Sequence, residues 1–225
     1  EPVEFEGFPA CYAASTACEA PCDRVILYLH GGGYTAGGLD YAKGFGALLA
    51  SQTRLRVFCA AYRLAPEHPF PAAQEDALTA YRFLLDQGYA PSRIAVVGES
   101  AGGGLSFSLV MRLRDEGLPL PACVVAISPW TDLTLSGTSY QSNAQRDPTL
   151  LREVLEQCAA AYAPGREREA YVSPVYGDVA GFPPCLLFAG SDEILLSDSV
   201  MFRRKLTHAH VRSTLVVERG MWHVY

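Results

Sequence analysis

Short, unbroken apolar runs recur along this chain, and helix-length segments separate them. Runs that are too short for helices and apolar at every position are typical of strands buried on both faces. The first, at residues 25–29, is apolar throughout, and similar, mainly apolar runs lie at residues 56–61, 94–98, 122–127, 185–190 and 213–218. The helix-length segments between them cover residues 41–53, 71–88, 101–117 and 195–207. This alternation predicts an α/β fold with a mostly parallel sheet and helices on both faces.

One stretch, residues 134–171, interrupts the alternation and is longer than a plain connection between two strands. It carries a helical segment at about residues 149–161, between Pro148 and Pro164. We interpret the stretch as a small lid or cap insertion beside the functional site, and an ordinary crossover helix with a long lead-in is the alternative. Since the chain has 225 residues, we predict a single α/β domain over residues 1–225.

Charge and composition exclude several classes of function. The formal net charge is −6, and residues 203–205 form the longest basic run, so we expect no nucleic-acid partner, which would need a basic face. No stretch reaches the roughly 18 apolar residues of a membrane span. No secretory signal is visible, so the expected location is the cytoplasm. Cys18 and Cys22 have the spacing of a zinc knuckle, but no second pair follows, and we expect no metal.

The segment at residues 98–102 reads Gly-Glu-Ser-Ala-Gly and fits the pattern G-x-S-x-G. It follows a predicted strand and precedes a predicted helix, which is the context that this nucleophile motif requires. The N-terminus of the helix behind the serine favours negative charge there. The alternative is a phosphate-binding turn, but the second glycine of a dinucleotide site and the lysine of a P-loop are missing. We therefore predict that Ser100 is a nucleophile.

A second motif, at residues 30–33, reads His-Gly-Gly-Gly directly after the first predicted strand. Acyl transfer creates a tetrahedral oxyanion that needs backbone N–H donors. Glycine lets the backbone approach such a group closely. We expect Gly31, Gly32 and Ala101 to supply the donors and interpret His30 as an anchor of the loop. A tight turn without a catalytic role is the alternative.

A serine nucleophile needs a base, and the base needs an acid that orients it. Among the five histidines, His223 lies a few residues past the last predicted strand, so we expect it at the same sheet edge as Ser100. Asp192 follows the preceding strand by two residues and is predicted to be the acid, with Glu193 and Asp198 as alternatives. The chain order Ser-Asp-His agrees with that of triads on parallel sheets.

Together, these motifs resemble those of the hormone-sensitive-lipase-like esterases, also called bacterial family IV carboxylesterases. The resemblance spans about residues 25–225 and includes further matches at residues 62–67, 71–76, 128–133 and 190–193. It implies an α/β-hydrolase fold, no metal or cofactor, and hydrolysis of carboxylic esters through an acyl-enzyme. It also supports Ser100, Asp192 and His223 as the triad.

Similar enzymes use the stretch at residues 62–67 to brace the loops of the oxyanion hole. Arg63, Glu67 and Asp76 are therefore candidates for a supporting polar network, and ordinary surface charges are the alternative. Two features depart from the family pattern. Ala61 stands where aspartate is common, and both ends are short for this family, so we expect the chain to be a fragment of a longer reading frame.

The expected function is that of a serine carboxylesterase acting on small esters, with Tyr34, Trp130 and Leu195 binding the substrate. The preference for short to medium acyl chains is implied by the resemblance alone. An amidase, arylformamidase or peptidase of the same fold is one alternative, because the motifs do not separate esters from amides. A non-catalytic small-molecule receptor on the same scaffold is another, and His223 argues against it, because such receptors lack the catalytic histidine. Homodimer formation stays open.

Overall fold

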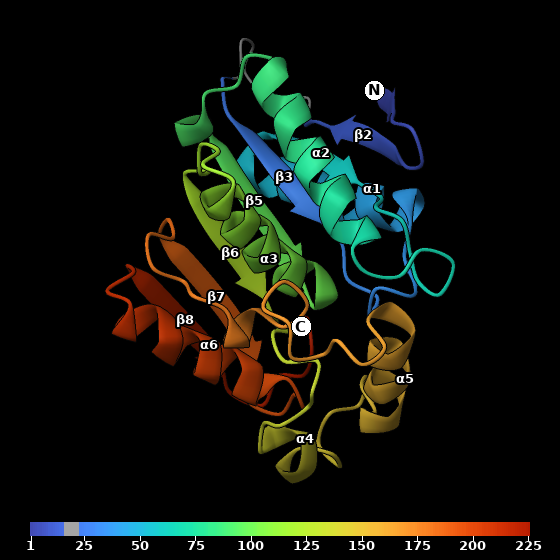
Figure 1. Cartoon of the computed structure of the whole chain (residues 1–225), viewed down its shortest axis with the longest axis vertical. Helices are drawn as coiled ribbons and strands as arrows, with labels where there is room; N and C mark the ends of the chain where they lie inside the picture. Colours follow the sequence, from blue (N-terminus) through green and yellow to red (C-terminus); the bar gives the residue numbers. More distant parts are fainter. Residues whose placement is uncertain (16–22) are drawn as a thin grey trace.

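A single twisted sheet forms the centre of the molecule (Figure 1). The computed structural model describes residues 1–15 and 23–225, and within them the sheet has eight strands in the order β1-β2-β4-β3-β5-β6-β7-β8. The strands are β1 (Pro2–Glu4), β2 (Pro9–Ala13), β3 (Val25–Leu29), β4 (Arg56–Ala60), β5 (Ile94–Glu99), β6 (Cys123–Ile127), β7 (Cys185–Gly190) and β8 (Ser213–Glu218). Neighbours from β4 to β8 pair in parallel, while β1 and β2 are antiparallel. The predicted mostly parallel sheet is confirmed.

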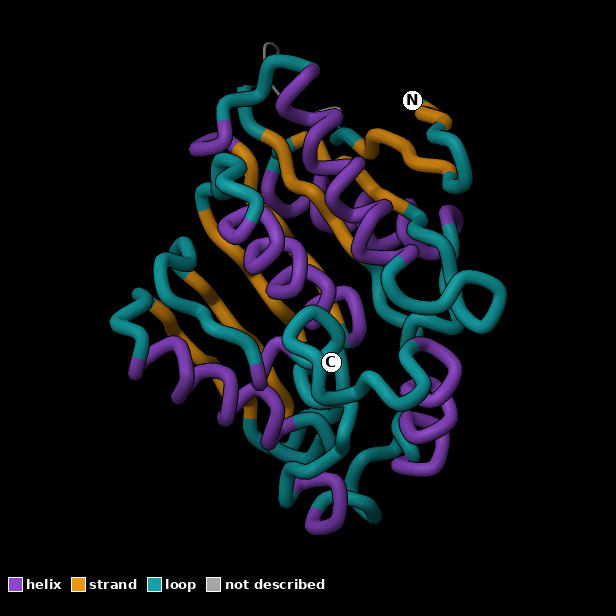
Figure 2. Tube along the Cα trace, viewed as in Figure 1, coloured by secondary structure: helices purple, strands orange, loops and turns teal. Residues whose placement is uncertain are grey.

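Helices cover both faces of this sheet, as predicted. The helix α1 (Leu39–Thr53) packs on β2, β3 and β4 from one side. On the other side lie α2 (Ala72–Asp86), α3 (Ala101–Asp115) and α6 (Leu196–His208), of which α3 packs on β5 and β6 and α6 on β7 and β8 (Figure 2). Short 3-10 helices occur at η1 (Pro91–Arg93) and η2 (Pro174–Tyr176).

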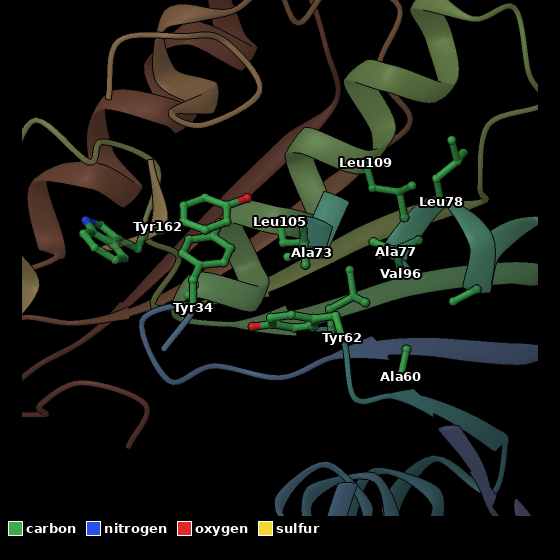
Figure 3. Close-up of a cluster of buried hydrophobic side chains, with 14 of the residues drawn as sticks. Tyr34, Ala60, Tyr62, Ala73, Ala77, Leu78, Val96, Leu105, Leu109 and Tyr162 are labelled. Carbon is green, nitrogen blue, oxygen red and sulfur yellow. The ribbon is translucent and has the colours of Figure 1, made fainter. Parts of the chain in front are cut away.

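The main core lies between the sheet and the helices α2 and α3. Figure 3 shows Ala73 and Ala77 of α2 beside Val96 of β5 and Leu105 and Leu109 of α3, all of them buried. The small alanine side chains allow α2 to approach the sheet closely. Each fully buried leucine or valine contributes roughly 1.5–3 kcal/mol. This core fixes the strand ends from which the functional loops leave.

The stretch that interrupts the alternation, residues 134–171, follows β6 and carries α4 (Ser139–Ser142) and α5 (Arg152–Tyr162). Both helices lie beyond the carboxyl ends of the parallel strands (Figure 1). That edge of a parallel sheet is where ligands bind. The role of this segment as a lid stays a prediction. None of the helices in the described part of the chain has the length and apolar content needed to cross a membrane.

Candidate active site

Ser100 sits on a strained turn between β5 and α3. Its backbone has φ 55° and ψ −123°, a conformation that non-glycine residues seldom adopt. Two hydrogen bonds fix it, because the Ser100 N–H donates to the Ile127 carbonyl (2.9 Å) and the Trp130 N–H donates to the Ser100 carbonyl (2.9 Å). The residue is 8% exposed and lines a cavity. The turn therefore presents the serine beyond the sheet, where a nucleophile is needed.

Glycine at the start of α3 brings the two predicted motifs together. A Cβ on Gly102 would collide with the carbonyl oxygens of Leu29 and His30, so only glycine allows the helix to begin this close to the end of β3. The loop that follows β3 then passes beside the nucleophile. A Cβ on Gly31 would lie 3.0 Å from the Ser100 Cβ. The glycine loop and the serine turn are thus direct neighbours.

His30 fixes the glycine loop through ring stacking and hydrogen bonds. Its buried ring stacks on Tyr62 with 4.3 Å between centroids, and the Tyr62 hydroxyl donates to the His30 carbonyl (2.6 Å). Its Nδ1 lies 2.7 Å from the Gly31 carbonyl oxygen and donates to it. Burial lowers the pKa of His30, so the ring is neutral at pH 7. These contacts agree with the interpretation of His30 as a loop anchor.

The stretch after Tyr62 forms a polar network that contains two of the three predicted residues, Arg63 and Asp76. The Arg63 guanidinium contacts Asp76 through Nη2 (2.7 Å) and Nε (3.0 Å), and the Arg63 backbone N–H donates to the same buried carboxylate (2.8 Å). The carboxylate of Glu75 lies 3.5 Å from Arg63. Glu67, in contrast, is exposed to solvent, so Glu75 takes the place that was expected for it.

His223 lies in the loop after β8, at the predicted sheet edge. Its side chain is 8% exposed and lines the same cavity as Ser100. Main-chain bonds hold the loop, since the Asp192 N–H donates to the Met221 carbonyl (2.9 Å) and the Val224 N–H donates to the Ser128 hydroxyl (3.1 Å). The structure thus brings a serine and a histidine from distant parts of the chain to one cavity.

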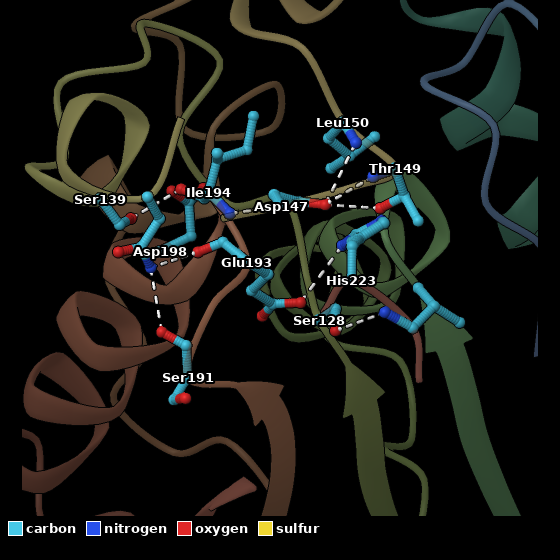
Figure 4. Close-up of polar contacts among 12 residues, drawn as sticks. Ser128, Ser139, Asp147, Thr149, Leu150, Ser191, Glu193, Ile194, Asp198 and His223 are labelled. Atoms are coloured by element: carbon cyan, nitrogen blue, oxygen red, sulfur yellow. Dashed lines mark hydrogen bonds and ion pairs between the residues drawn. The ribbon is translucent and has the colours of Figure 1, made fainter. Parts of the chain in front are cut away.

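Glu193, and not Asp192, contacts this histidine. The Glu193 Oε2 lies 3.3 Å from the His223 Nδ1, and the Glu193 side chain is fully buried (Figure 4). The carboxylate of Asp192 is partly exposed and accepts a hydrogen bond from the Ser191 hydroxyl instead (2.9 Å). Asp198 is buried elsewhere, where it accepts from the Thr131 N–H (2.8 Å). The prediction for Asp192 is therefore corrected, because adjacent side chains in this turn point in different directions.

Burial raises the pKa of Glu193, and the hydrogen bond and charge of His223 oppose that rise. Residues of the insertion hold the acid in place. The Asn143 side-chain amide donates to the carbonyls of Ser191 (3.0 Å) and Glu193 (2.9 Å). Asp147 accepts from the N–H of Ile194 (2.9 Å), the residue after the acid (Figure 4). The sequence analysis did not single out Asn143 or Asp147. Their position in the predicted insertion was the signal that could have pointed to them.

The cavity has a volume of about 340 Å³. The glycine loop at residues 31–33 lines it together with Ser100 and His223, and apolar side chains of the insertion form a further wall. These are Leu150, Val154, Leu155 and Cys158. The Cys158 Sγ lies 3.3 Å from the Thr35 hydroxyl, so α5 closes directly onto the glycine loop. The four side chains were not predicted as site residues, because their sequence shows only an apolar helix face.

The three predicted substrate-binding residues do not line this cavity. Tyr34, Trp130 and Leu195 are all fully buried in the core. Tyr34 has a left-handed backbone (φ 64°), and its ring stacks face to face on Tyr162 of α5 with 3.8 Å between centroids (Figure 3). The prediction is corrected, because these large apolar side chains pack beneath the cavity and support it.

No group of three or more metal-ligating side chains occurs among the residues that the structure describes. Cys18 and Cys22, the pair with zinc-knuckle spacing, lie outside the described residues. The site described above contains a nucleophile, a base, an acid and a glycine loop. Such a set of groups can carry out acyl transfer without a metal.

Comparison with known proteins places this arrangement in a family. A family model described as alpha/beta hydrolase fold matches residues 26–225. A curated relative, the acetyl-hydrolase of Streptomyces hygroscopicus, is 39% identical over 203 residues, which cover 90% of this chain and 68% of that protein.

Solved structures give the same result. An esterase/lipase from an uncultured bacterium superimposes with a TM-score of 0.95 and 40% identity over 100% of this chain and 75% of that one. An esterase from the bacterial hormone-sensitive lipase family also has a TM-score of 0.95, with 41% identity and the same coverage of both chains. The chain therefore belongs to the alpha/beta hydrolase fold family and, within it, to the hormone-sensitive-lipase-like carboxylesterases, which are serine hydrolases.

Proposed function

We propose that this chain hydrolyses small carboxylic esters through an acyl-enzyme formed on Ser100. The observation that carries the proposal is the single cavity onto which Ser100, His223 and the glycine loop all open. The contact between His223 and the buried Glu193 supports it, because a catalytic base needs an orienting acid. The family of esterases to which the chain belongs supports the same reaction.

The reaction uses the three side chains in sequence. The Ser100 hydroxyl oxygen attacks the ester carbonyl carbon while the His223 Nε2 takes the hydroxyl proton. His223 then gives this proton to the leaving alcohol, and the acyl group stays on Ser100. A water molecule then loses a proton to His223 and attacks the acyl carbon. His223 passes this proton to the Ser100 oxygen as the carboxylic acid leaves. Glu193 keeps Nδ1 of His223 in its donor form throughout and stabilises the imidazolium.

The oxyanion needs backbone donors, and the glycine loop and the start of α3 can supply them. Gly31 and Gly32 both line the cavity of Ser100, and Gly31 lies directly against the Ser100 side chain. The Ala101 N–H lies in the first turn of α3, where N–H groups have no partner within the helix. We therefore assign the oxyanion to the three predicted donors, the backbone N–H groups of Gly31, Gly32 and Ala101.

The size of the cavity supports small substrates. Ligand cavities commonly measure about 300–1,000 Å³, and the cavity of about 340 Å³ lies at the lower end of that range. Its insertion wall is apolar, which suits a short to medium acyl chain or a small alcohol. The name of the relative called acetyl-hydrolase points to the same size of acyl group. The cytoplasmic location, the lid and the homodimer remain predictions from the sequence.

Replacing the nucleophile tests the proposal. Ser100→Ala is expected to abolish the turnover of p-nitrophenyl acetate, because loss of the nucleophile costs about 10⁶-fold in a serine hydrolase. Ser108→Ala, a buried serine of the same helix, should retain activity. A fluorophosphonate should label Ser100 in the unaltered chain. Undiminished activity of Ser100→Ala would refute the mechanism, and equal rates on matched ester and amide substrates would favour the amidase alternative.

A further inference from the structure

The loop after β6 occupies the middle of the site. In the sheet, β6 lies between β5, which leads to the nucleophile, and β7, which leads to the acid. The first residue after β6, Ser128, is therefore placed between Ser100 and Glu193. It is fully buried and has a left-handed backbone, with φ 48°. A buried serine in an unusual conformation at this position calls for a physical role.

The backbone of this loop is tied to the neighbouring strands. The Ser128 N–H donates to the Phe188 carbonyl of β7 (2.7 Å), and two residues later the Trp130 N–H donates to the carbonyl of Ser100 (2.9 Å). These bonds fix where the Ser128 side chain starts. The Ser128 hydroxyl is therefore held in a fixed position relative to the groups around it.

The Ser128 hydroxyl reaches the loop that carries the base. Its oxygen accepts a hydrogen bond from the N–H of Val224, the residue after His223 (3.1 Å), and Figure 4 shows it beside the Glu193 carboxylate. Because the oxygen accepts from Val224, its proton is available for another acceptor. Among the described residues the buried Glu193 Oε1 has no hydrogen-bond partner, so this carboxylate oxygen is free to accept that proton.

We propose that Ser128 is a positioning residue of the hydrolysis, whose single hydroxyl joins the acid Glu193 to the main chain beside the base His223. The inference rests on the proposed function, since it assumes that these two residues act together. The hydroxyl accepts from the Val224 N–H and, in this proposal, gives its own proton to the Glu193 carboxylate beside it, so it links both partners of the 3.3 Å contact. A displacement of about 1 Å in such a contact costs roughly 10²-fold in rate.

The donor also changes how the pair binds a proton. The hydroxyl presents the positive end of its dipole to the pair, which disfavours an added proton on either member. Removing the hydroxyl therefore destabilises the unprotonated pair, with Glu193 charged and His223 neutral, more than the protonated pair. The pair then holds its proton to higher pH, whichever member carries it. The other titratable groups that face Glu193 are Asp147 and Tyr225, and both stay unchanged in a Ser128 variant.

The test compares Ser128→Ala and Ser128→Gly with the unaltered chain, using p-nitrophenyl acetate between about pH 5 and 9. Both variants lack the hydroxyl, and glycine suits the left-handed backbone if alanine unfolds. We expect kcat to fall about tenfold or more with KM nearly unchanged. We also expect the acid limb of kcat/KM to move up by about half to one pH unit.

Ser173→Ala is the matched control. Ser173 is also buried, and its hydroxyl accepts from the Leu133 N–H (2.8 Å) and donates to the Glu167 carbonyl (2.6 Å), away from the triad. The acid limb of this variant should not move. An unmoved acid limb in both Ser128 variants, with or without a lower kcat, would overturn the inference while the proposed function stands. If the unaltered chain neither turned over the ester nor reacted with fluorophosphonate, the proposed function itself would fail.

Discussion

Two neighbouring carboxylates offer a decisive comparison, because only Glu193 contacts His223. We predict that Glu193→Gln removes most of the activity, whereas Asp192→Asn changes it less than about tenfold, the scale of a surface hydrogen bond. Both substitutions exchange a carboxylate for an amide of nearly the same size. The two substitutions therefore differ in their position but not in their chemistry, and each variant is the control for the other.

The magnitude follows from the geometry. During the reaction His223 becomes an imidazolium 3.3 Å from the buried Glu193 carboxylate. Opposite unit charges at that distance attract by about 5 kcal/mol at an effective dielectric constant of about 20. At about 1.4 kcal/mol for each factor of ten, Glu193→Gln should lower kcat by roughly 10³–10⁴-fold.

The assay is kcat for p-nitrophenyl acetate at about pH 8. Thermal unfolding of each variant should accompany it, so that a folding defect is recognised. A loss of more than about 10³-fold in Asp192→Asn, together with a mild effect of Glu193→Gln, would falsify the assignment of the acid. The original sequence-based choice of Asp192 would then be restored.

Two further predictions concern stability and the glycine loop. Since burial raises the pKa of Glu193, the folded chain holds this proton more tightly than the unfolded chain, and stability falls as pH rises from about 4.5 through the folded pKa. Glu193→Gln should therefore melt at a higher temperature than the unaltered chain at about pH 8, and this difference in melting temperature should vanish near pH 4. Calorimetry that finds the same difference at both pH values would contradict this. Gly32→Ala should lower kcat about 10²–10³-fold. Gly32 has φ 108°, and the Cβ of an alanine there would collide with the Ala36 carbonyl oxygen and shift the loop. Full turnover of this variant in the esterase assay would place the oxyanion elsewhere.

The parts of the site that could be predicted are those whose chemistry requires a local backbone shape. The strained turn at Ser100 needs glycine on both sides, and the loop after β3 needs a run of glycines, so both leave a readable pattern. The central strands were predictable for a similar reason. A strand buried on both faces, such as β3, is apolar at every position.

Side-chain direction could not be predicted in the same way. Asp192 and Glu193 are adjacent carboxylates after one strand, and the sequence contains nothing that says which of them faces His223. Tyr34 belongs to the glycine-loop motif, yet its left-handed backbone turns the ring into the core. Position along the chain located the sheet edge, while tertiary packing decided which side chains face the cavity.

The two N-terminal strands were also missed. The strands β1 and β2 have three and five residues, begin with proline and alternate only weakly between buried and exposed positions. Strands this short gain stability from their partners rather than from their own sequence. Here the partner is β4, whose edge pairs with β2 in antiparallel register from Ala10 to Ala13.

The bonds that run from the insertion to the acid limit how this enzyme can be redesigned. Asn143 and Asp147 hold the loop of Glu193, and Asp147 also accepts from the N–H of Leu150, a residue of the cavity wall. Grafting the segment from another esterase would therefore alter substrate range and turnover together. Val154 and Cys158 of α5 also line the cavity, but they take no part in the bonds named above. Directed evolution could therefore change substrate range at these two residues and leave the loop of Glu193 intact.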